Sequence, residues 1–171
     1  MWKTLWKTLT VVDKWLFYLD NEYMEKRVVN IYEYMPVLRE ILEQDKDVSF
    51  LITGNSMSPF LVHQRDTIII SKPKEDFKVG DMVFYTRESG QYIMHRVYKV
   101  EGNYLYMVGD AQVEIEGPLP KECVFGIVKK VIRKNKLIDK SNFWFWFFEN
   151  IWIRIVPFRK IIVKLVTLIR K

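Results

Sequence analysis

Ser56 and His95 are the residues of this chain that could act together as a nucleophile and its base. A serine hydroxyl is a weak nucleophile at neutral pH and needs a neighbour that takes its proton, a role that histidine fills well. The chain has two histidines, and the other one, His63, lies in a polar turn. His95 lies in the strand-like run 91–100, where alternation aims a side chain at a fixed point. We therefore expect this pair to attack a carbonyl group, with activity rising through the histidine titration near roughly pH 6–7.

Four short motifs surround these two residues. They are GNSMSP at 54–59, VGDMVF at 79–84, YIMHRV at 92–97 and VGDA at 108–111. In this order they resemble the sequence boxes of signal peptidase I and of the self-cleaving repressors of the LexA type. Bacterial signal peptidases and LexA-type proteins carry lysine where His95 stands, whereas signal peptidases of the endoplasmic-reticulum and archaeal type carry histidine. The resemblance covers residues 48–130 and implies a serine endopeptidase with Ser56 as the nucleophile and His95 as the general base.

The resemblance also implies a third catalytic residue, an acid that holds the imidazole ring. In the histidine-type relatives an aspartate has this role shortly after the G-D motif, and its position falls on Glu116. Asp110 and Glu114 are the alternatives. Asp110 could equally be a turn residue that caps the loop after Gly109.

The oxyanion hole is expected in the segment around the nucleophile. Signal peptidases usually place a serine hydroxyl two residues before the nucleophile, where this chain has Gly54. The donor is then expected to be the Ser56 backbone N–H, as in the LexA type, with Asn55 or Thr53 as possible helpers. Met57 is expected to line the substrate cleft or the core.

The middle of the chain is expected to be mainly β-structure, a signal peptidase/LexA-like β-rich catalytic core at residues 46–135. Strand-like runs rich in β-branched and aromatic residues are separated by short turn signals, which favours a small β-barrel-like sheet over a βαβ unit. The expected strands are 48–52, 67–71, 81–85, 91–100, 104–108 and 123–133. One helix is expected before them, at residues 34–43, with Val37, Leu38, Ile41 and Leu42 on its apolar face.

Amphipathic helices are expected at both termini. Residues 1–45 show apolar residues at helical spacing from Trp2 to Leu19, with lysines on the other faces. Residues 136–171 begin with the aromatic run 143–148 and continue into a helix with a narrow basic stripe. Charges in this segment disfavour a transmembrane span, so an interfacial helix on an anionic membrane surface is expected. Packing on the core or on a second copy of the chain, as in a homodimer, is the alternative.

Composition limits the kinds of partner and cofactor that this chain is expected to bind. The formal net charge is +6, and the basic residues at the ends alternate with large apolar ones, a pattern that favours lipid over nucleic acid. Two histidines and one cysteine do not have the spacing of a zinc site, so neither a metal nor another cofactor is expected. The single cysteine, Cys123, excludes an internal disulfide and agrees with a reducing compartment. We expect a peripheral protein on the cytoplasmic side of a membrane.

Three functions remain in competition. The first is a Ser56/His95 endopeptidase that cleaves leader or signal segments from peptide or protein precursors, with small residues before the scissile bond as the resemblance implies. The second is a LexA-like regulator that cleaves itself, although no Ala-Gly or Cys-Gly cleavage pair occurs in the chain. The third is a catalytically silent module that binds an extended peptide by strand addition.

Overall fold

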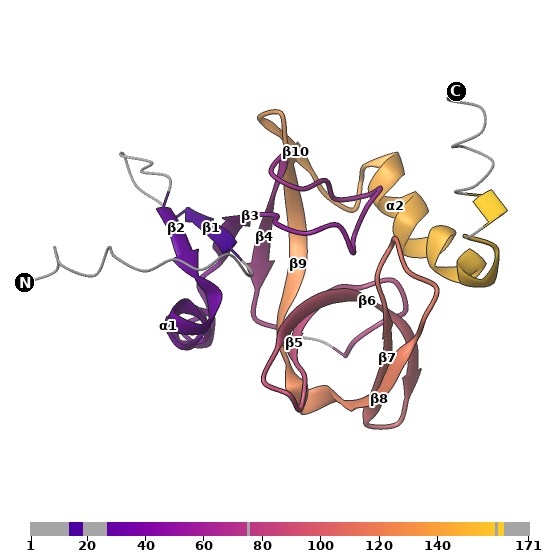
Figure 1. The fold of residues 1–171 in the computed structure, drawn as a ribbon, viewed down its shortest axis with the longest axis horizontal. Helices are drawn as coiled ribbons and strands as arrows, with labels where there is room; N and C mark the ends of the chain where they lie inside the picture. Colours follow the sequence, from indigo (N-terminus) through magenta and orange to yellow (C-terminus); the bar gives the residue numbers. More distant parts are fainter. Residues whose placement is uncertain (1–13, 19–26, 75, 160, 163–171) are drawn as a thin grey trace, which may run out of the picture.

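The computed structural model describes residues 14–18, 27–74, 76–159 and 161–162 (Figure 1). Their strands form one antiparallel sheet in the order β2-β1-β3-β4-β9-β5-β6-β7-β8, with β10 paired to β9 beside this path. The strands are β1 Lys14–Tyr18, β2 Arg27–Asn30, β3 Val48–Leu51, β4 Asp66–Ser71, β5 Met82–Thr86, β6 Tyr92–Glu101, β7 Tyr104–Val108, β8 Glu116–Pro120, β9 Val124–Arg133 and β10 Lys136–Ile138. The helices are α1 Ile31–Glu43 and α2 Phe143–Asn150, with short 3-10 segments η1 Lys121–Cys123 and η2 Trp152–Phe158. The β-rich core predicted from the sequence is confirmed.

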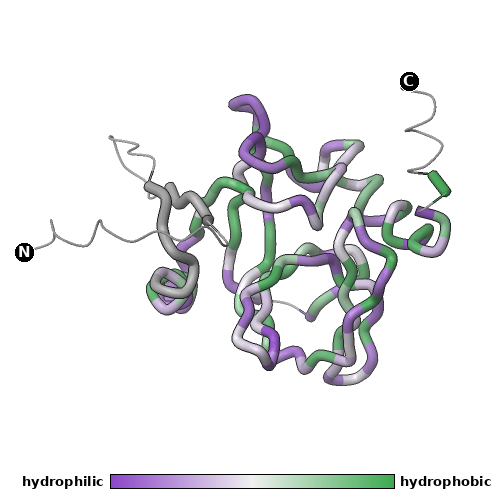
Figure 2. Tube along the Cα trace, in the orientation of Figure 1, coloured by the Kyte–Doolittle hydropathy of each residue, from purple (hydrophilic) through white to green (hydrophobic). Residues whose placement is uncertain are grey.

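Strand β9 joins the two halves of the sheet. Its last residues pair with β4, where Asp66 lies opposite Arg133, and its first residues pair with β5, where Val83 lies opposite Ile127. Figure 1 shows β5, β6, β7 and β8 curving round on one side of this long strand, with α1 and the short strands β1 and β2 on the other. The turn between β9 and β10 is hydrophilic, whereas β4 and β5, the strands on either side of β9, contain hydrophobic stretches (Figure 2).

One hydrophobic cluster lies beneath the segment that carries Ser56. It combines side chains from α1, β3, β4, α2 and the loop between β3 and β4. Members from the loop are Met57, Phe60 and Leu61, and members from the C-terminal segments are Phe145, Phe148 and Trp152. The α2 helix therefore belongs to the core that supports the nucleophile segment.

A second cluster fills the curved half of the sheet, between β5, β6, β7 and β9. Val83, Tyr85, Val97, Leu105 and Met107 are fully buried there. Tyr85 is thus a polar aromatic residue inside an otherwise apolar cluster, and its hydroxyl needs a hydrogen-bond partner.

The N-terminal region differs from the helices predicted for residues 1–45. Lys14–Tyr18 is a strand that pairs with both β2 and β3, because the edge of β3 offers backbone groups that a strand can satisfy and a helix cannot. Arg27–Asn30 is likewise a strand, and α1 follows it directly. The apolar face of α1 consists of Met35, Leu38 and Leu42 with the partly buried Ile41, whereas Val37 is exposed. Residues 1–13 and 19–26 of the predicted helices lie outside the described residues.

The C-terminal region predicted as one interfacial helix at 136–171 is divided. Lys136–Ile138 is strand β10, α2 ends at Asn150, and η2 follows. The α2 helix begins where the Asn142 side chain accepts a hydrogen bond from the Trp144 N–H at 2.9 Å, a typical N-cap. In the part of the chain that the structure describes, no helix has the length and apolar character needed to cross a bilayer. The narrow polar stripe predicted at Lys160, Lys164, Thr167 and Lys171 falls outside that part.

Candidate active site

Ser56 lies in the loop between β3 and β4, and this loop is fixed by its own core contacts. Hydrogen bonds run from Ser58 N–H to Asn55 O at 3.0 Å and from Leu61 N–H to Met57 O at 2.8 Å. The Met57 side chain is buried in the core, so of its two predicted positions it takes the core one. Ser56 itself is partly exposed between this buried anchor and the exposed Asn55.

The residue two positions before the nucleophile is held by the second histidine. The Gly54 N–H donates a hydrogen bond to His63 Nδ1 at 2.9 Å, and Gly54 has a φ of 104°, which favours glycine. The Gly54 amide is therefore occupied and cannot serve an oxyanion. By contrast, the Ser56 N–H has no partner among the described residues.

The turn after β7, which contains Gly109, contacts the backbone of Ser56. The Ala111 N–H donates to the Ser56 carbonyl oxygen at 2.8 Å. A Cβ atom on Gly109 would lie 2.6 Å from the same oxygen, closer than real carbon atoms approach. Glycine is thus required at 109 because the two backbones meet there.

His95 lies on β6 with its side chain 3% exposed. Its Nδ1 lies 3.1 Å from the hydroxyl oxygen of Tyr85, and that hydroxyl donates to Glu116 Oε2 at 2.8 Å. Arg87 clamps the carboxylate, with Nε donating to Oε1 at 2.6 Å and Nη2 donating to Oε2 at 2.6 Å. Glu116, the predicted third acid, is therefore linked to His95 through Tyr85, and no direct hydrogen bond between Glu116 and His95 exists among the described residues.

Burial and charge set the protonation states in this chain of groups. Burial lowers the pKa of His95 to about 4, with the Glu116 charge opposing the shift. Burial also acts against ionisation of Glu116, but hydrogen bonds from Arg87 and Tyr85 outweigh it and hold the pKa of Glu116 below its usual range. Burial and the Glu116 carboxylate raise the pKa of Tyr85 well above its usual value. At neutral pH the imidazole is neutral, the carboxylate is ionised and the tyrosine is protonated.

The second imidazole nitrogen, Nε2, is open. It has no hydrogen-bond partner in the described chain. It is also not one of the fully buried polar atoms that lack a hydrogen-bond partner, so this nitrogen is accessible. Ser56 Oγ and His95 are likewise not joined by a hydrogen bond in the described residues. In peptidases without substrate such a bond is often long and tightens on binding.

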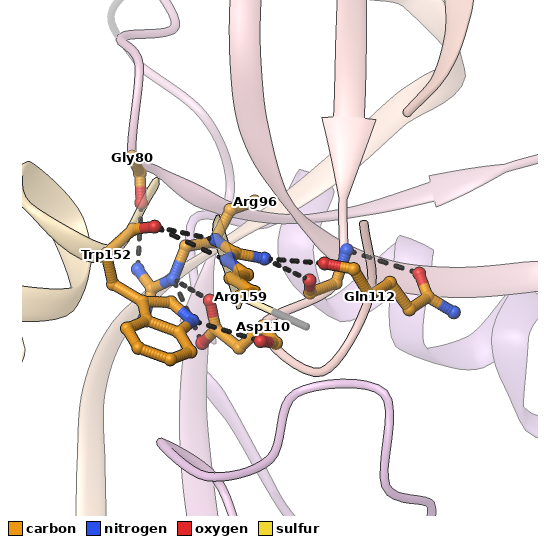
Figure 3. Close-up of polar contacts among 7 residues, drawn as sticks. Gly80, Arg96, Asp110, Gln112, Trp152 and Arg159 are labelled. Carbon is orange, nitrogen blue, oxygen red and sulfur yellow. Dashed lines mark hydrogen bonds and ion pairs between the residues drawn. The ribbon is translucent and has the colours of Figure 1, made fainter. Parts of the chain in front are cut away.

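Asp110, the alternative third acid, has another role. Its carboxylate pairs with Arg96 Nε at 2.8 Å, and both side chains are completely buried. Burial raises the pKa of Asp110, and the charge of Arg96 opposes that shift. Since Arg96 also donates to the Gly80 carbonyl oxygen at 2.9 Å, the pair ties the turn after β7 to β6 and to the segment before β5 (Figure 3). Asp110 is thus a buried structural anchor.

The C-terminal segment η2 and the residue after it hold the same turn. Trp152 Nε1 donates to the Asp110 carbonyl oxygen at 3.0 Å. Arg159 Nη1 donates to the carbonyl oxygens of Gly109 at 2.7 Å and Gln112 at 3.0 Å, while Nη2 donates to Trp152 O at 3.0 Å (Figure 3). Burial lowers the pKa of Arg159 to about 10, which still leaves it charged at neutral pH.

A cleft of about 470 Å³ lies along the segment that follows this turn. It is lined by Arg87 and by every residue from Ala111 to Glu116. One end of this wall is hydrogen-bonded to Ser56, and the other end is the carboxylate that reaches His95 through Tyr85. Neither Ser56 nor His95 lines the cleft itself, but each is linked to one end of its wall. Glu114, the other alternative acid, lines the cleft without a hydrogen bond to the catalytic pair in the described residues.

Comparison with known families gives one match, in which the profile of the Peptidase S24-like family matches residues 22–114. The chain belongs to the Peptidase S24-like family. This membership agrees with the signal peptidase/LexA resemblance and supports an enzyme of the serine peptidase type. No curated protein and no solved structure gave a match.

The S24-like match includes Ser56 and His95 and ends two residues before Glu116. It also leaves out the C-terminal segments that hold the turn behind Ser56. Tyr85, Arg87 and Arg159 were not predicted as functional from the sequence. An alternating strand pattern could have put Tyr85 on the same face as Val83, the partner of His95, but only if the pairing of the two strands were known.

The part of this S24-like chain that the structure describes contains no group of three or more histidine, cysteine, aspartate or glutamate residues arranged to hold a metal ion.

Proposed function

We propose that the chain is a serine endopeptidase that cleaves leader or signal segments from peptide or protein precursors at a membrane surface. The observation that carries this proposal is the single cleft wall, 111–116, which contacts Ser56 at one end and is linked to His95 at the other. A peptide lying along this wall passes both residues.

In the proposed reaction, Ser56 Oγ attacks the scissile carbonyl carbon while His95 Nε2 takes its proton. His95 then gives this proton to the leaving amine, and the acyl group stays on Ser56 as an acyl-enzyme. Water hydrolyses this acyl-enzyme by the same steps in reverse. A neutral imidazole is required at the start, in agreement with the low pKa of His95.

The proposed oxyanion donor is the Ser56 backbone N–H, which has no other partner in the described chain. Because Gly54 donates its N–H to His63, that amide is not a candidate. Removing one oxyanion donor typically costs roughly 2.7–4 kcal/mol of transition-state stabilisation. A second donor would come from Asn55, whose side chain is exposed beside Ser56.

The proposed substrate is an extended peptide. Residues 113–115 lie between β7 and β8 outside the sheet, and their backbone groups take part in no backbone hydrogen bond among the described residues. Such a free edge can pair with a peptide by strand addition. The arrangement would direct side chains of the peptide alternately into the cleft and away from it.

The proposed partner is an anionic bilayer, bound by the outer face of α2. Phe143, Trp144 and Trp146 are 61%, 56% and 46% exposed, although the opposite face of the same helix is core. Phe158 and Ile161 are exposed farther along, with the exposed Arg154 between them and α2. Exposed aromatic rings beside basic residues suit the headgroup region, and the anionic lipid of the cytoplasmic leaflet would attract the net charge of +6. We therefore propose peripheral attachment to the cytoplasmic face.

The test is mass-spectrometric profiling of a diverse peptide library with vesicles of phosphatidylserine and phosphatidylcholine. Wild-type protein is compared with Ser56→Ala and with Ser58→Ala, a matched control in the same loop. We expect cleavage with wild type and Ser58→Ala and none with Ser56→Ala. Cleavage that survives in Ser56→Ala would reject the proposed nucleophile. Loss of the chain's own intact mass without library cleavage would favour self-cleavage, and peptide retention without any cleavage would favour the binding module.

A further inference from the structure

We propose that Tyr85 is a positioning residue whose hydroxyl stands between the catalytic histidine and its acid, and selects the imidazole tautomer with the proton on Nδ1. The inference rests on the proposed function only for its kinetic consequence, because the tautomer can be observed without any substrate.

The number of protons held by Glu116, Tyr85 and His95 determines which group donates in each hydrogen bond. An ionised carboxylate accepts hydrogen bonds and donates none, so the single hydroxyl proton of Tyr85 must point to Glu116 Oε2. The Tyr85 oxygen then meets His95 Nδ1, 3.1 Å away, only with its lone pairs. His95 Nδ1 must therefore carry the proton, and Nε2 keeps the lone pair that a general base needs.

The second step is that Arg87 fixes the direction of this chain. It donates to both oxygens of Glu116, and these charge-assisted bonds keep the carboxylate ionised and in one orientation. Oε2 therefore accepts from Arg87 and from Tyr85 together. If Glu116 were neutral, its own proton could point to Tyr85, and the tyrosine proton could turn to His95.

The third step is that Tyr85 cannot move away. Its side chain is completely buried in the second hydrophobic cluster, among Val83, Val97 and Leu105. Its ring lies tilted against the imidazole, with ring centres 6.1 Å apart. Tyr85 thus fills the space that a direct contact between Glu116 and His95 would need, and the hydroxyl carries the influence of the acid across it.

The test measures the tautomer of His95 by ¹⁵N imidazole NMR at pH 7, in a chain with two histidines. We expect wild type to show protonated Nδ1 and unprotonated Nε2, and Tyr85→Phe to lose this preference. The kcat for a cleaved peptide should fall at least roughly twofold in Tyr85→Phe with KM unchanged, because a base without a tautomer preference is productive in only about half of the molecules. The control is Tyr106→Phe, which removes a tyrosine bond to Glu101 of 3.1 Å on the exposed side of β7.

Glu116→Gln is the second variant, because it leaves the buried tyrosine ring intact if Tyr85→Phe fails to fold. Its side chain has one acceptor oxygen in place of two, so it cannot serve Arg87 and Tyr85 as Glu116 does. We expect the same change of tautomer, and in the double variant little further loss of kcat than in either single one.

Two results would overturn the inference. One is a wild-type imidazole protonated on Nε2, and the other is an unchanged tautomer in both Tyr85→Phe and Glu116→Gln. If the predicted tautomer changes occur but wild type cleaves nothing, Tyr85 keeps its positioning role and the proposed peptidase function fails. The two failures are thus distinguishable.

Discussion

The Ala111 backbone N–H donates a hydrogen bond of 2.8 Å to the carbonyl oxygen of Ser56. This bond joins the loop after β3 to the turn after β7, two segments far apart in the sequence. The position of Ser56 therefore depends on a turn that is itself held by Arg96, Trp152 and Arg159.

The first prediction concerns Gly109. In Gly109→Ala the new methyl group would meet the Ser56 carbonyl oxygen at 2.6 Å, so the two segments must separate. We expect a loss of about 1–3 kcal/mol in the free energy of unfolding and a marked fall in kcat. Urea unfolding and peptide cleavage measure the two effects. Gly126→Ala is the control, because its nearest neighbour is the end of the Ile70 side chain at 3.4 Å. Equal effects in both variants would contradict the special role of the contact with Ser56.

A second prediction concerns Arg159. Arg159→Ala removes the side-chain donor of the Gly109, Gln112 and Trp152 carbonyl oxygens, of which the Gly109 oxygen still accepts from the Gln112 N–H at 3.0 Å and Gln112 is exposed. We expect the free energy of unfolding to fall by roughly 1–3 kcal/mol, the cost of leaving one buried carbonyl oxygen, that of Trp152, without this donor. Arg154→Ala, an exposed arginine on the same segment with one bond to Asn150 O of 2.9 Å, should change stability by less than about 0.5 kcal/mol. Denaturant titration of both variants shows whether an arginine stabilises this segment through buried hydrogen bonds or only through its positive charge.

The third prediction is the pH profile of cleavage. His95 must be neutral to accept the Ser56 proton, and its pKa is about 4. The value of kcat/KM should therefore stay level as pH falls from 8 to near 5 and drop only as pH approaches 4. The ordinary histidine pKa, from which we expected a rise near roughly pH 6–7, applies to a solvated ring. A half-maximum near 6.5 would mean that His95 is solvated in the working enzyme.

The free energy of unfolding should also depend on pH through the titration of His95. The folded pKa of His95 lies below the unfolded value, so its contribution is complete above about pH 6.5 and is lost as pH falls toward 4. The loss from His95 alone is about 3 kcal/mol over this window. Urea midpoints at several pH values measure it. His95→Gln should flatten the profile.

A last prediction concerns the exposed aromatic face of α2. Deleting residues 143–171 is unsuitable as a test, because Phe145, Phe148 and Trp152 belong to the core. The double variant Trp144→Ala and Trp146→Ala removes exposed rings only. We expect its affinity for phosphatidylserine vesicles, measured by co-sedimentation, to fall at least roughly tenfold, since about 1.4 kcal/mol of apolar contact suffices. Tyr104→Ala, an exposed aromatic on β7, should bind as wild type does. Unchanged binding by the double variant would remove α2 as the lipid-binding face.

The sequence predicted the parts of this fold that depend on local pattern. Alternating residues gave β4, where Ile68 and Ile70 are buried and their neighbours are not. Strand β1 was missed because its pairing with β3 is a long-range contact that overrides helical spacing. Ser56 and His95 were predicted from their motifs. Arg159 was expected among lipid-facing charges, because no local signal tells an arginine that satisfies buried carbonyl groups from one that faces a membrane.

The contacts of Arg159 and Trp152 also concern the time at which the site can form. Arg159 lies 103 residues after Ser56 in the chain, and a domain generally folds as a unit during synthesis. While the ribosome is still adding α2 and η2, the turn behind Ser56 lacks two of its donors. The Ser56 loop is therefore completed only when residue 159 has left the ribosome, so the proposed peptidase activity would begin only after that point.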